Sequence, residues 1–239
     1  MLSIIIPTLN EEKYLPVLLK SIARQDFKDY EIIIADANSK DKTLDIAREH
    51  NCKIVSGGLP AKGRNEGSRA AKGENLLFLD ADIILPPNFF RKALSEFNAE
   101  KINFGAFILL PYPKNKISYF FFNNFYNKQT AFFEKFSPHA AGAAILIKKD
   151  VFKKLNGYDE TVKLAEDHDL AKRAKKITKF GFLKSTKVFV SDRRFRQNGW
   201  SNTIMKYVFC EFYMALVGPV RSDIFKYEFG HYDRYMEDK

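Results

Sequence analysis

Hydrophobic and polar positions alternate in blocks along the first hundred residues. The apolar blocks are short, and the first three contain Ile or Val, which predicts strands at 2–6, 31–35, 53–55 and, from the run Leu76-Leu77-Phe78-Leu79, at 75–79. Between them, apolar side chains recur at helical spacing, which predicts helices at 11–24, 41–49 and 62–72. Strands that alternate with helices are typical of parallel βαβ units. We therefore predict an α/β fold with a Rossmann-like, mostly parallel central sheet flanked by helices.

The pattern changes after Pro86-Pro87. It predicts a helix at about 88–97, strands at 104–110 and 143–147, and helices at 166–176 and 200–217. Nine of the twenty residues 117–136 are Phe or Tyr. Because no internal repeat or Gly/Ser-rich linker divides the chain, we predict one domain, 1–239, with two halves at about 1–100 and about 101–239.

Polar residues begin where the predicted strands end. The segments 7–12, 36–41 and 80–82 each follow a strand directly. In an open α/β sheet the ligand lies outside the carboxyl ends of the strands. We therefore expect these three segments to line one cleft.

Asp80-Ala81-Asp82 places two carboxylates at the mouth of a buried strand, with their side chains on the same side. Such a pair is costly without a cation. A divalent ion such as Mg²⁺ or Mn²⁺, completed by substrate phosphates, relieves the repulsion. The alternative is acidic capping of the helix that follows.

Three more motifs accompany this pair along the chain: Pro7-Thr8-Leu9-Asn10-Glu11-Glu12, Asp36-Ala37-Asn38-Ser39-Lys40-Asp41 and Gly63-Arg64-Asn65-Glu66-Gly67. In this order and spacing the sequence resembles glycosyltransferase family 2, nucleotide-sugar-dependent enzymes with a GT-A fold, over roughly residues 2–196. The resemblance implies a set of contacts: Pro7, Thr8, Asn10, Glu12 and Asp36 for the nucleoside, Arg64 and Asn65 for base or phosphate, Asp80 for the ribose, Ala81 for the nucleotide sugar, and Asp82 for the metal.

Two of these residues have structural alternatives. Asp36 can accept hydrogen bonds from a base or a ribose hydroxyl, but it can also form an Asx turn with Asn38 and Ser39. Glu12 can instead complement the dipole in the first turn of a helix.

Glu166-Asp167-His168-Asp169-Leu170 begins the helix predicted at 166–176. It resembles the Glu-Asp element of inverting family members, which implies that Asp167 is the general base, that Glu166 orients or binds the acceptor, and that Asp169 is structural. Displacement of a nucleoside diphosphate from an anomeric carbon requires deprotonation of the acceptor hydroxyl. Acids at a helix start are also common as caps.

Two segments upstream belong to the acceptor side in this resemblance. His139 precedes a strand whose family counterpart lines the acceptor site, so it either contacts the diphosphate or the metal or is a satisfied turn histidine. The segment 156–160 resembles a Gly-Gly-Phe-Asp-Glu loop in which Asn156 replaces the first glycine. Asn tolerates positive φ better than most residues.

Charge distinguishes the second half. The formal net charge is +10, and residues 171–196 hold ten basic residues and one acid, Asp192. Lysines in such a run commonly form a solvated face. Arg193 and Arg194 instead resemble an Arg-Arg element that closes over the diphosphate in some subfamilies, and guanidinium groups bind phosphate oxygens bidentately. No Gln-x-x-Arg-Trp element of cellulose-synthase-like members is found, which disfavours processive polymer synthesis.

The aromatic residues of 117–136 populate several faces of a helix, so packing against one core cannot cover them all. Four lysines are interspersed or adjacent: Lys114, Lys116, Lys128 and Lys135. This composition fits peripheral contact with an anionic membrane that carries a polyprenyl-phosphate or other lipid-linked acceptor, and it also fits core or dimer packing.

We therefore predict an inverting, metal-dependent glycosyltransferase that moves one sugar from a nucleoside-diphosphate sugar to an acceptor hydroxyl or phosphate. A sugar-phosphate nucleotidyltransferase is the nearest alternative, but the Gly-rich basic loop expected after its first strand is missing. A nucleic-acid-binding protein would suit the net charge but not the ordered acidic motifs, so we expect no nucleic-acid partner. Two cysteines and the lack of a visible secretory signal favour the cytoplasm, with the inner membrane face as the place of any peripheral contact.

Overall fold

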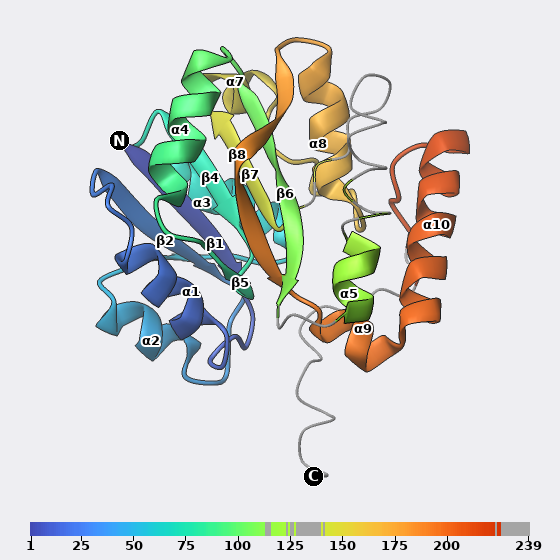
Figure 1. Ribbon diagram of the computed structural model, residues 1–239, viewed down its shortest axis with the longest axis horizontal. Helices are drawn as coiled ribbons and strands as arrows, with labels where there is room; N and C mark the ends of the chain where they lie inside the picture. Colours follow the sequence, from blue (N-terminus) through green and yellow to red (C-terminus); the bar gives the residue numbers. More distant parts are fainter. Residues whose placement is uncertain are drawn as a thin grey trace.

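The computed structural model of this chain describes residues 1–112, 116–122, 124, 127, 140, 142–222, 224 and 225, without the side chains of residues 116, 117, 121, 194, 198 and 215. In this part of the chain, helices cover both faces of one curled central sheet (Figure 1).

The described strands form an eight-stranded sheet in the order β3-β2-β1-β4-β7-β6-β8-β5. Their bounds are β1 Leu2–Thr8, β2 Tyr30–Asp36, β3 Lys53–Ser56, β4 Asn75–Leu79, β5 Ile83–Ile84, β6 Phe104–Tyr112, β7 Ala144–Lys148 and β8 Phe180–Ser191. The first four strands pair in parallel. β7 is antiparallel to β4 and to β6, β6 is parallel to β8, and β5 is antiparallel to β8. The parallel, Rossmann-like part of the sheet, β1 to β4, therefore continues into a part with both parallel and antiparallel pairs, β5 to β8.

The helices are α1 Leu15–Ala23, α2 Thr43–Glu49, α3 Pro60–Ala70, α4 Phe89–Ala99, α5 Lys116–Phe121, α7 Lys149–Lys154, α8 Glu166–Lys175, α9 Arg193–Asn198 and α10 Trp200–Leu216. Alternate residues of β1 enter two different cores, as the period of two in a strand requires. Ile4 and Ile6 pack with α1 and α4, whereas Ile5 packs in the core that contains residues of α3, α7 and α8.

The predicted strands and helices of the first hundred residues are confirmed, with ends that differ by at most four residues. The helix predicted at 11–24 is shorter, because residues 11–14 form a turn before α1. The strand predicted at 143–147 is β7, which runs antiparallel and so interrupts the parallel sheet.

The sequence pattern does not predict strand β8, because its residues lie within the basic run 171–196. Lys184 and Lys187 are exposed, while Thr186 and Val188 between and beside them are buried. The register with β6 shifts where the partner of Phe107 is Leu183 and that of Ile108 is Lys187. The Glu96 carboxylate from α4 accepts the N–H groups of Lys184 and Ser185 in this bulge, at 2.9 and 2.8 Å. The basic run is therefore divided among α8, β8 and α9.

The aromatic segment 117–136 lies only partly within the described residues. Its first part is α5, and Phe122 after it is buried and contacts Phe195 of α9, with ring centroids 5.8 Å apart. The predicted apolar helix at 200–217 is confirmed as α10. Among the described helices, none has the length and apolar character needed to cross a bilayer.

Candidate active site

The loops after β1 and β2 are joined by hydrogen bonds around Asp36. This buried carboxylate accepts hydrogen bonds from Thr8 Oγ1 at 2.8 Å and from the N–H and Oγ of Ser39 at 2.8 and 2.6 Å. Asn10, at φ +55°, donates its N–H to Ser39 Oγ at 2.9 Å and accepts the Lys40 N–H at 2.8 Å. The turn considered as an alternative for Asp36 is therefore present, and it fixes the two loops against each other.

Helix α3 packs very closely on the parallel strands. A Cβ atom at Gly63 would lie 3.2 Å from Pro7 Cβ, and one at Gly67 would lie 2.3 Å from Ile5 Cγ2. Two glycines one helical turn apart thus allow this approach. The approach brings Arg64 and Asn65, which lie between them, to the ends of the strands.

The two adjacent glutamates of the first loop point to different places. Glu11 is buried, and its carboxylate accepts two hydrogen bonds from Arg193, at 3.0 and 2.8 Å. Glu12 accepts the N–H of Lys42 at the start of α2, at 3.1 Å. The predicted nucleotide contact Glu12 thus lies at the N-terminus of α2, whereas Glu11, which was not predicted, lies with Asp82.

Arg193 connects the end of β8 to the first loop and to the Asp-x-Asp segment. Its Nε lies 2.9 Å from Asp82 Oδ2, and its two Nη atoms bind Glu11. The guanidinium carbon lies 4.4 Å from the centre of the Tyr14 ring. The side chain of Arg194 and the whole of His139 lie outside the described residues.

Arg64 joins the Asp-x-Asp segment to the start of α8. Its Nη1 donates to Glu166 Oε1 at 2.6 Å, and its Nη2 donates to Asp80 Oδ1 at 2.8 Å and to the Gly142 carbonyl at 3.2 Å. The side chain of Arg64 is buried, and its guanidinium carbon lies 5.4 Å from the centre of the Tyr158 ring. Two acids that lie far apart in the sequence thus share one buried cation.

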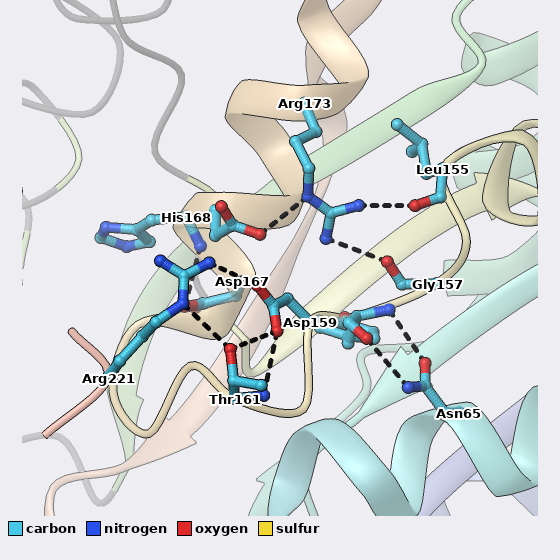
Figure 2. Close-up of polar contacts among 11 residues, drawn as sticks. Asn65, Leu155, Gly157, Asp159, Thr161, Asp167, His168, Arg173 and Arg221 are labelled. Atoms are coloured by element: carbon cyan, nitrogen blue, oxygen red, sulfur yellow. Dashed lines mark hydrogen bonds and ion pairs between the residues drawn. The ribbon is translucent and has the colours of Figure 1, made fainter. Parts of the chain in front are cut away.

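Asn65 holds the 156–160 loop. Its amide donates to the Tyr158 carbonyl at 3.0 Å, and its Oδ1 accepts the Tyr158 N–H at 2.9 Å (Figure 2). The amide also donates to Glu160 Oε1 at 2.8 Å. Asn156 and Gly157 both have positive φ, and a Cβ at Gly157 would lie 2.5 Å from Asn65 Oδ1. The side-chain amide of Asn65 is therefore engaged by this loop.

The first turn of α8 presents Asp167. Its Oδ1 accepts the N–H of His168 at 3.0 Å, and the residue before the helix, Ala165, has φ +59°. A Cβ at Gly142 would lie 3.1 Å from Asp167 Oδ2, so a larger residue at position 142 would crowd this oxygen. His168 Nδ1 lies 3.1 Å from Glu211 Oε1 of α10. Asp167 thus lies near Arg64, and the next residue, His168, contacts α10 through Glu211.

Two arginines hold the loop before α8 (Figure 2). Arg173 Nη1 and Nη2 donate to the carbonyls of Leu155 and Gly157 at 2.7 and 2.9 Å, and its Nε lies 2.8 Å from Asp169 Oδ2. Asp169 therefore has a structural contact, as the sequence predicts. At the other end of the loop, Arg221 binds Asp159 and Thr161, at 2.7 and 3.0 Å.

The site has more negative than positive side chains. Burial raises the pKa of Glu11 to about 7, with Arg193 acting against this and Asp82 and Asp80 adding to it. Burial also raises the pKa of Glu166, although Arg64 opposes the rise. The acidic cluster comprises Glu11, Asp80, Asp82, Glu166 and Asp167, with Arg64 and Arg193 as its cations. A cation is therefore favoured here.

The donor set suits a magnesium or manganese ion that is shared with a phosphorylated ligand. The described residues contain no group of three or more His, Cys, Asp or Glu side chains gathered as a complete metal site. Ions of this kind are usually held by one or two carboxylates together with substrate phosphates. The Asp82 side chain is 19% exposed, whereas Ala81 beside it is buried, so the Asp82 carboxylate is partly accessible to solvent.

A cavity of about 120 Å³ lies between the start of α3 and the loop before α8. It is lined by Leu59, Pro60, Ala61, Lys62, Glu160, Val162, Lys163 and Glu166. Glu166 therefore contacts Arg64 and also lines this cavity, which Arg64 does not line.

The family model described as Glycosyl transferase family 2 matches residues 3–155, more than half of the chain. The chain belongs to this family. One family relative is the poly(ribitol-phosphate) beta-N-acetylglucosaminyltransferase TarS of Staphylococcus aureus, 39% identical over 90 residues, which are 34% of this chain and 16% of TarS. Another is the GalNAc(5)-diNAcBac-PP-undecaprenol beta-1,3-glucosyltransferase of Campylobacter jejuni, 38% identical over 92 residues, which are 34% of this chain and 29% of the relative. The chain thus matches less than a third of the length of each of these relatives.

Solved structures share the fold of this family 2 chain. TarS residues 1–349 with UDP-GlcNAc superpose with a TM-score of 0.65 at 22% identity, covering 80% of this chain and 58% of that one. The mannosyltransferase PcManGT of Pyrobaculum calidifontis with GDP-Man and Mn²⁺ gives 0.67 at 19% identity, covering 91% and 70%. The predicted family and GT-A fold are therefore confirmed.

Proposed function

We propose that this protein transfers one sugar from a nucleoside-diphosphate sugar to an acceptor hydroxyl or phosphate, with inversion at the anomeric carbon. The observation that carries the proposal is the double contact of Arg64. One guanidinium group binds Asp80, on the predicted donor side, and Glu166, on the predicted acceptor side, at 2.8 and 2.6 Å. Both sets of acids therefore border one site, as a transfer between two bound substrates requires.

In this proposal the first half of the chain binds the donor. Pro7, Thr8, Asn10 and Asp36 form the nucleoside side, where the hydrogen bonds around Asp36 keep the two loops in fixed positions. Asp80 meets the ribose. A divalent cation, Mn²⁺ or Mg²⁺, would be held by Asp82 and would neutralise charge on the leaving diphosphate.

In the proposal, Arg193 binds the diphosphate of the donor. It now binds Asp82 and Glu11, so it occupies the acidic cluster with its own positive charge. Its guanidinium group can bind phosphate oxygens bidentately once a metal and a diphosphate engage Asp82. Arg194 is proposed as a second diphosphate contact on the same helix.

Asp167 is the proposed general base, and it takes the proton of the acceptor hydroxyl as that oxygen attacks the sugar. Its position in the first turn of α8 orients it through the His168 N–H. Glu166, fixed by Arg64, orients the acceptor. His139 is proposed as a further acceptor-side contact. Residues from about 101 onward thus form the acceptor half.

The acceptor is proposed to be lipid-linked, such as a polyprenyl phosphate or a saccharide carried on one. The name of the Campylobacter relative, which includes an undecaprenol diphosphate carrier, supports this choice. We place the reaction in the cytoplasm at a membrane surface.

The division of roles is tested by separating donor binding from turnover. Thermal shift with UDP-GlcNAc or GDP-Man, with and without Mn²⁺, measures donor binding, because a ligand of the native state raises stability according to its affinity. Asp82→Ala is expected to abolish the Mn²⁺-dependent shift. Asp167→Asn is expected to keep it and to lose about 10²- to 10⁴-fold in the rate of nucleoside-diphosphate release.

Asp45→Ala is the matched control, because this aspartate of α2 is exposed and forms only a surface pair with Arg48. It should leave both donor binding and rate unchanged. Equal loss of donor binding in Asp82→Ala and Asp167→Asn would contradict the roles. If neither UDP-GlcNAc nor GDP-Man raised the unfolding temperature of the wild-type protein, donor binding by these ligands would be contradicted.

A further inference from the structure

The helix α10 has apolar side chains on two opposite sides. On its inner side Thr203, Cys210 and Met214 are buried. On its outer side five large apolar residues at spacings of three and four are exposed: Met205, Val208, Phe209, Phe212 and Leu216. Phe212 is 63% exposed and Leu216 is 84% exposed. A contiguous row of this kind on a folded protein marks a contact surface.

This outer row belongs to a well-anchored helix. The Phe195 ring of α9 stacks on Trp200 at a centroid distance of 4.5 Å and meets Tyr207 edge-on at 6.1 Å. After the helix, the Val220 carbonyl accepts the N–H of Lys163 at 2.8 Å, which attaches the segment to the loop before α8. The exposure of the row is therefore a property of the packed helix.

The charges around the row identify its partner. The one acid of α10, Glu211, is turned inward to His168. Among the described side chains of residues 191–222, every exposed charged one is basic: Arg196, Lys206 and Arg221. Arg196 and Arg221 pair with Asp192 and Asp159, whose side chains are less exposed, so the charge that these pairs and Lys206 present to solvent is positive. A symmetric contact between two copies would bring these cations toward each other, in a chain whose formal net charge is already +10. An anionic surface instead complements them.

We propose that the outer row of α10 docks the protein on the surface of a membrane that contains anionic lipids. The helix of 17 residues is about 25 Å long, so it lies in the interface with its apolar row among the acyl chains. The cations lie beside the headgroups. This docking goes beyond sugar transfer and does not depend on it.

The docked orientation has a structural consequence for the catalytic helix. Glu211 of α10 contacts His168, the neighbour of Asp167. The membrane surface therefore lies on the outer side of α10, with this helix between it and the start of α8. If the proposed function holds, a lipid-linked acceptor would reach Asp167 from this side.

The test is co-sedimentation of the purified chain with vesicles of phosphatidylcholine alone or of phosphatidylcholine mixed equally with phosphatidylglycerol. The wild-type chain is expected to bind the mixed vesicles more tightly, and salt is expected to weaken this binding. Phe209→Ser and Phe212→Ser should each lower the affinity by about tenfold, because each removes a large apolar side chain from the interface. Lys206→Glu should weaken binding to the mixed vesicles only.

Ile177→Ser is the matched control, because Ile177 is 54% exposed but lies just after the C-terminal end of α8, outside α10. It should bind vesicles as the wild-type chain does. Because all substituted side chains are exposed, thermal unfolding should be unchanged, and the donor-dependent thermal shift should persist in every variant. These readouts separate a failure of docking from a failure of the proposed function.

Three outcomes would overturn the proposal. One is no binding of the wild-type chain to mixed vesicles. Another is equal binding by Phe212→Ser and the wild-type chain. The third is a concentration-dependent dimer of the wild-type chain in lipid-free buffer, measured by light scattering, that the Phe212→Ser variant does not form. The row would then be a subunit interface.

Discussion

Arg64 should be a main determinant of folding stability, and the substitution Arg64→Met removes its charge while keeping its apolar stem. The two carboxylates left behind differ in solvation. The Asp80 side chain is 38% exposed, so the loss of its partner should cost at most about 1 kcal/mol. The Glu166 side chain is 11% exposed, and a buried charge that loses its partner costs about 3–5 kcal/mol. The Glu166 contact should therefore dominate the loss.

Urea unfolding followed by far-UV circular dichroism measures this change in the free energy of unfolding. Arg69→Met is the matched control, because Arg69 lies on the same helix, is 62% exposed and pairs with Glu66 one turn away. Its cost should stay within about 0.5 kcal/mol. The comparison separates the loss of a buried charge partner from any general effect of Met in α3.

The double variant Arg64→Met/Glu166→Gln should recover most of the loss, because the orphaned acid is then neutral. The stability of Arg64→Met should also rise as the pH falls. Burial raises the pKa of Glu166 in the folded state, so protons bind the folded chain first and relieve the penalty below the folded pKa. If Arg64→Met cost no more than Arg69→Met, or Glu166→Gln gave no rescue, this account of the cluster would be wrong.

Two further predictions concern the elements around the site. Asn65→Ala leaves the backbone N–H and carbonyl of buried Tyr158 without partners, so urea unfolding should show a loss of about 2–4 kcal/mol, and a loss below about 1 kcal/mol would contradict the role of Asn65 as the holder of this loop. For His168, burial lowers the pKa, but Asp167 and Glu211 outweigh it and raise the pKa above its ordinary value. Its contribution to stability should therefore be complete below pH about 6.5 and lost as the pH rises through the raised pKa. Thermal unfolding against pH should show this slope for the wild-type chain and not for His168→Gln, and parallel profiles would refute it.

Local patterns determined much of this fold. The short apolar runs and helical spacings of the first hundred residues predict these strands and helices, because each element buries apolar side chains and its pattern is visible within a few residues. The motifs at the strand ends identify the family, and they predict the general location of the candidate site, since parallel strands place their carboxyl ends at one edge.

Tertiary structure alone decided which side chains meet. The contact of Arg193 with Glu11 joins residues 182 apart, and that of Arg64 with Glu166 joins residues 102 apart. Adjacent Glu11 and Glu12 have the same chemistry, and only the turn at Asn10 sends the first inward and the second to α2. No periodicity encodes such a choice.

The same limit applies to the outer elements. The pattern of β8 is broken by a bulge that Glu96 of another element satisfies, so its strand character depends on a distant partner. The apolar residues of α10 predict a helix but do not say which of its two sides is covered. The described neighbours of α10 pack on one side of it, while Phe209, Phe212 and Leu216 are exposed, since burial depends on which neighbours the folded chain brings to each face.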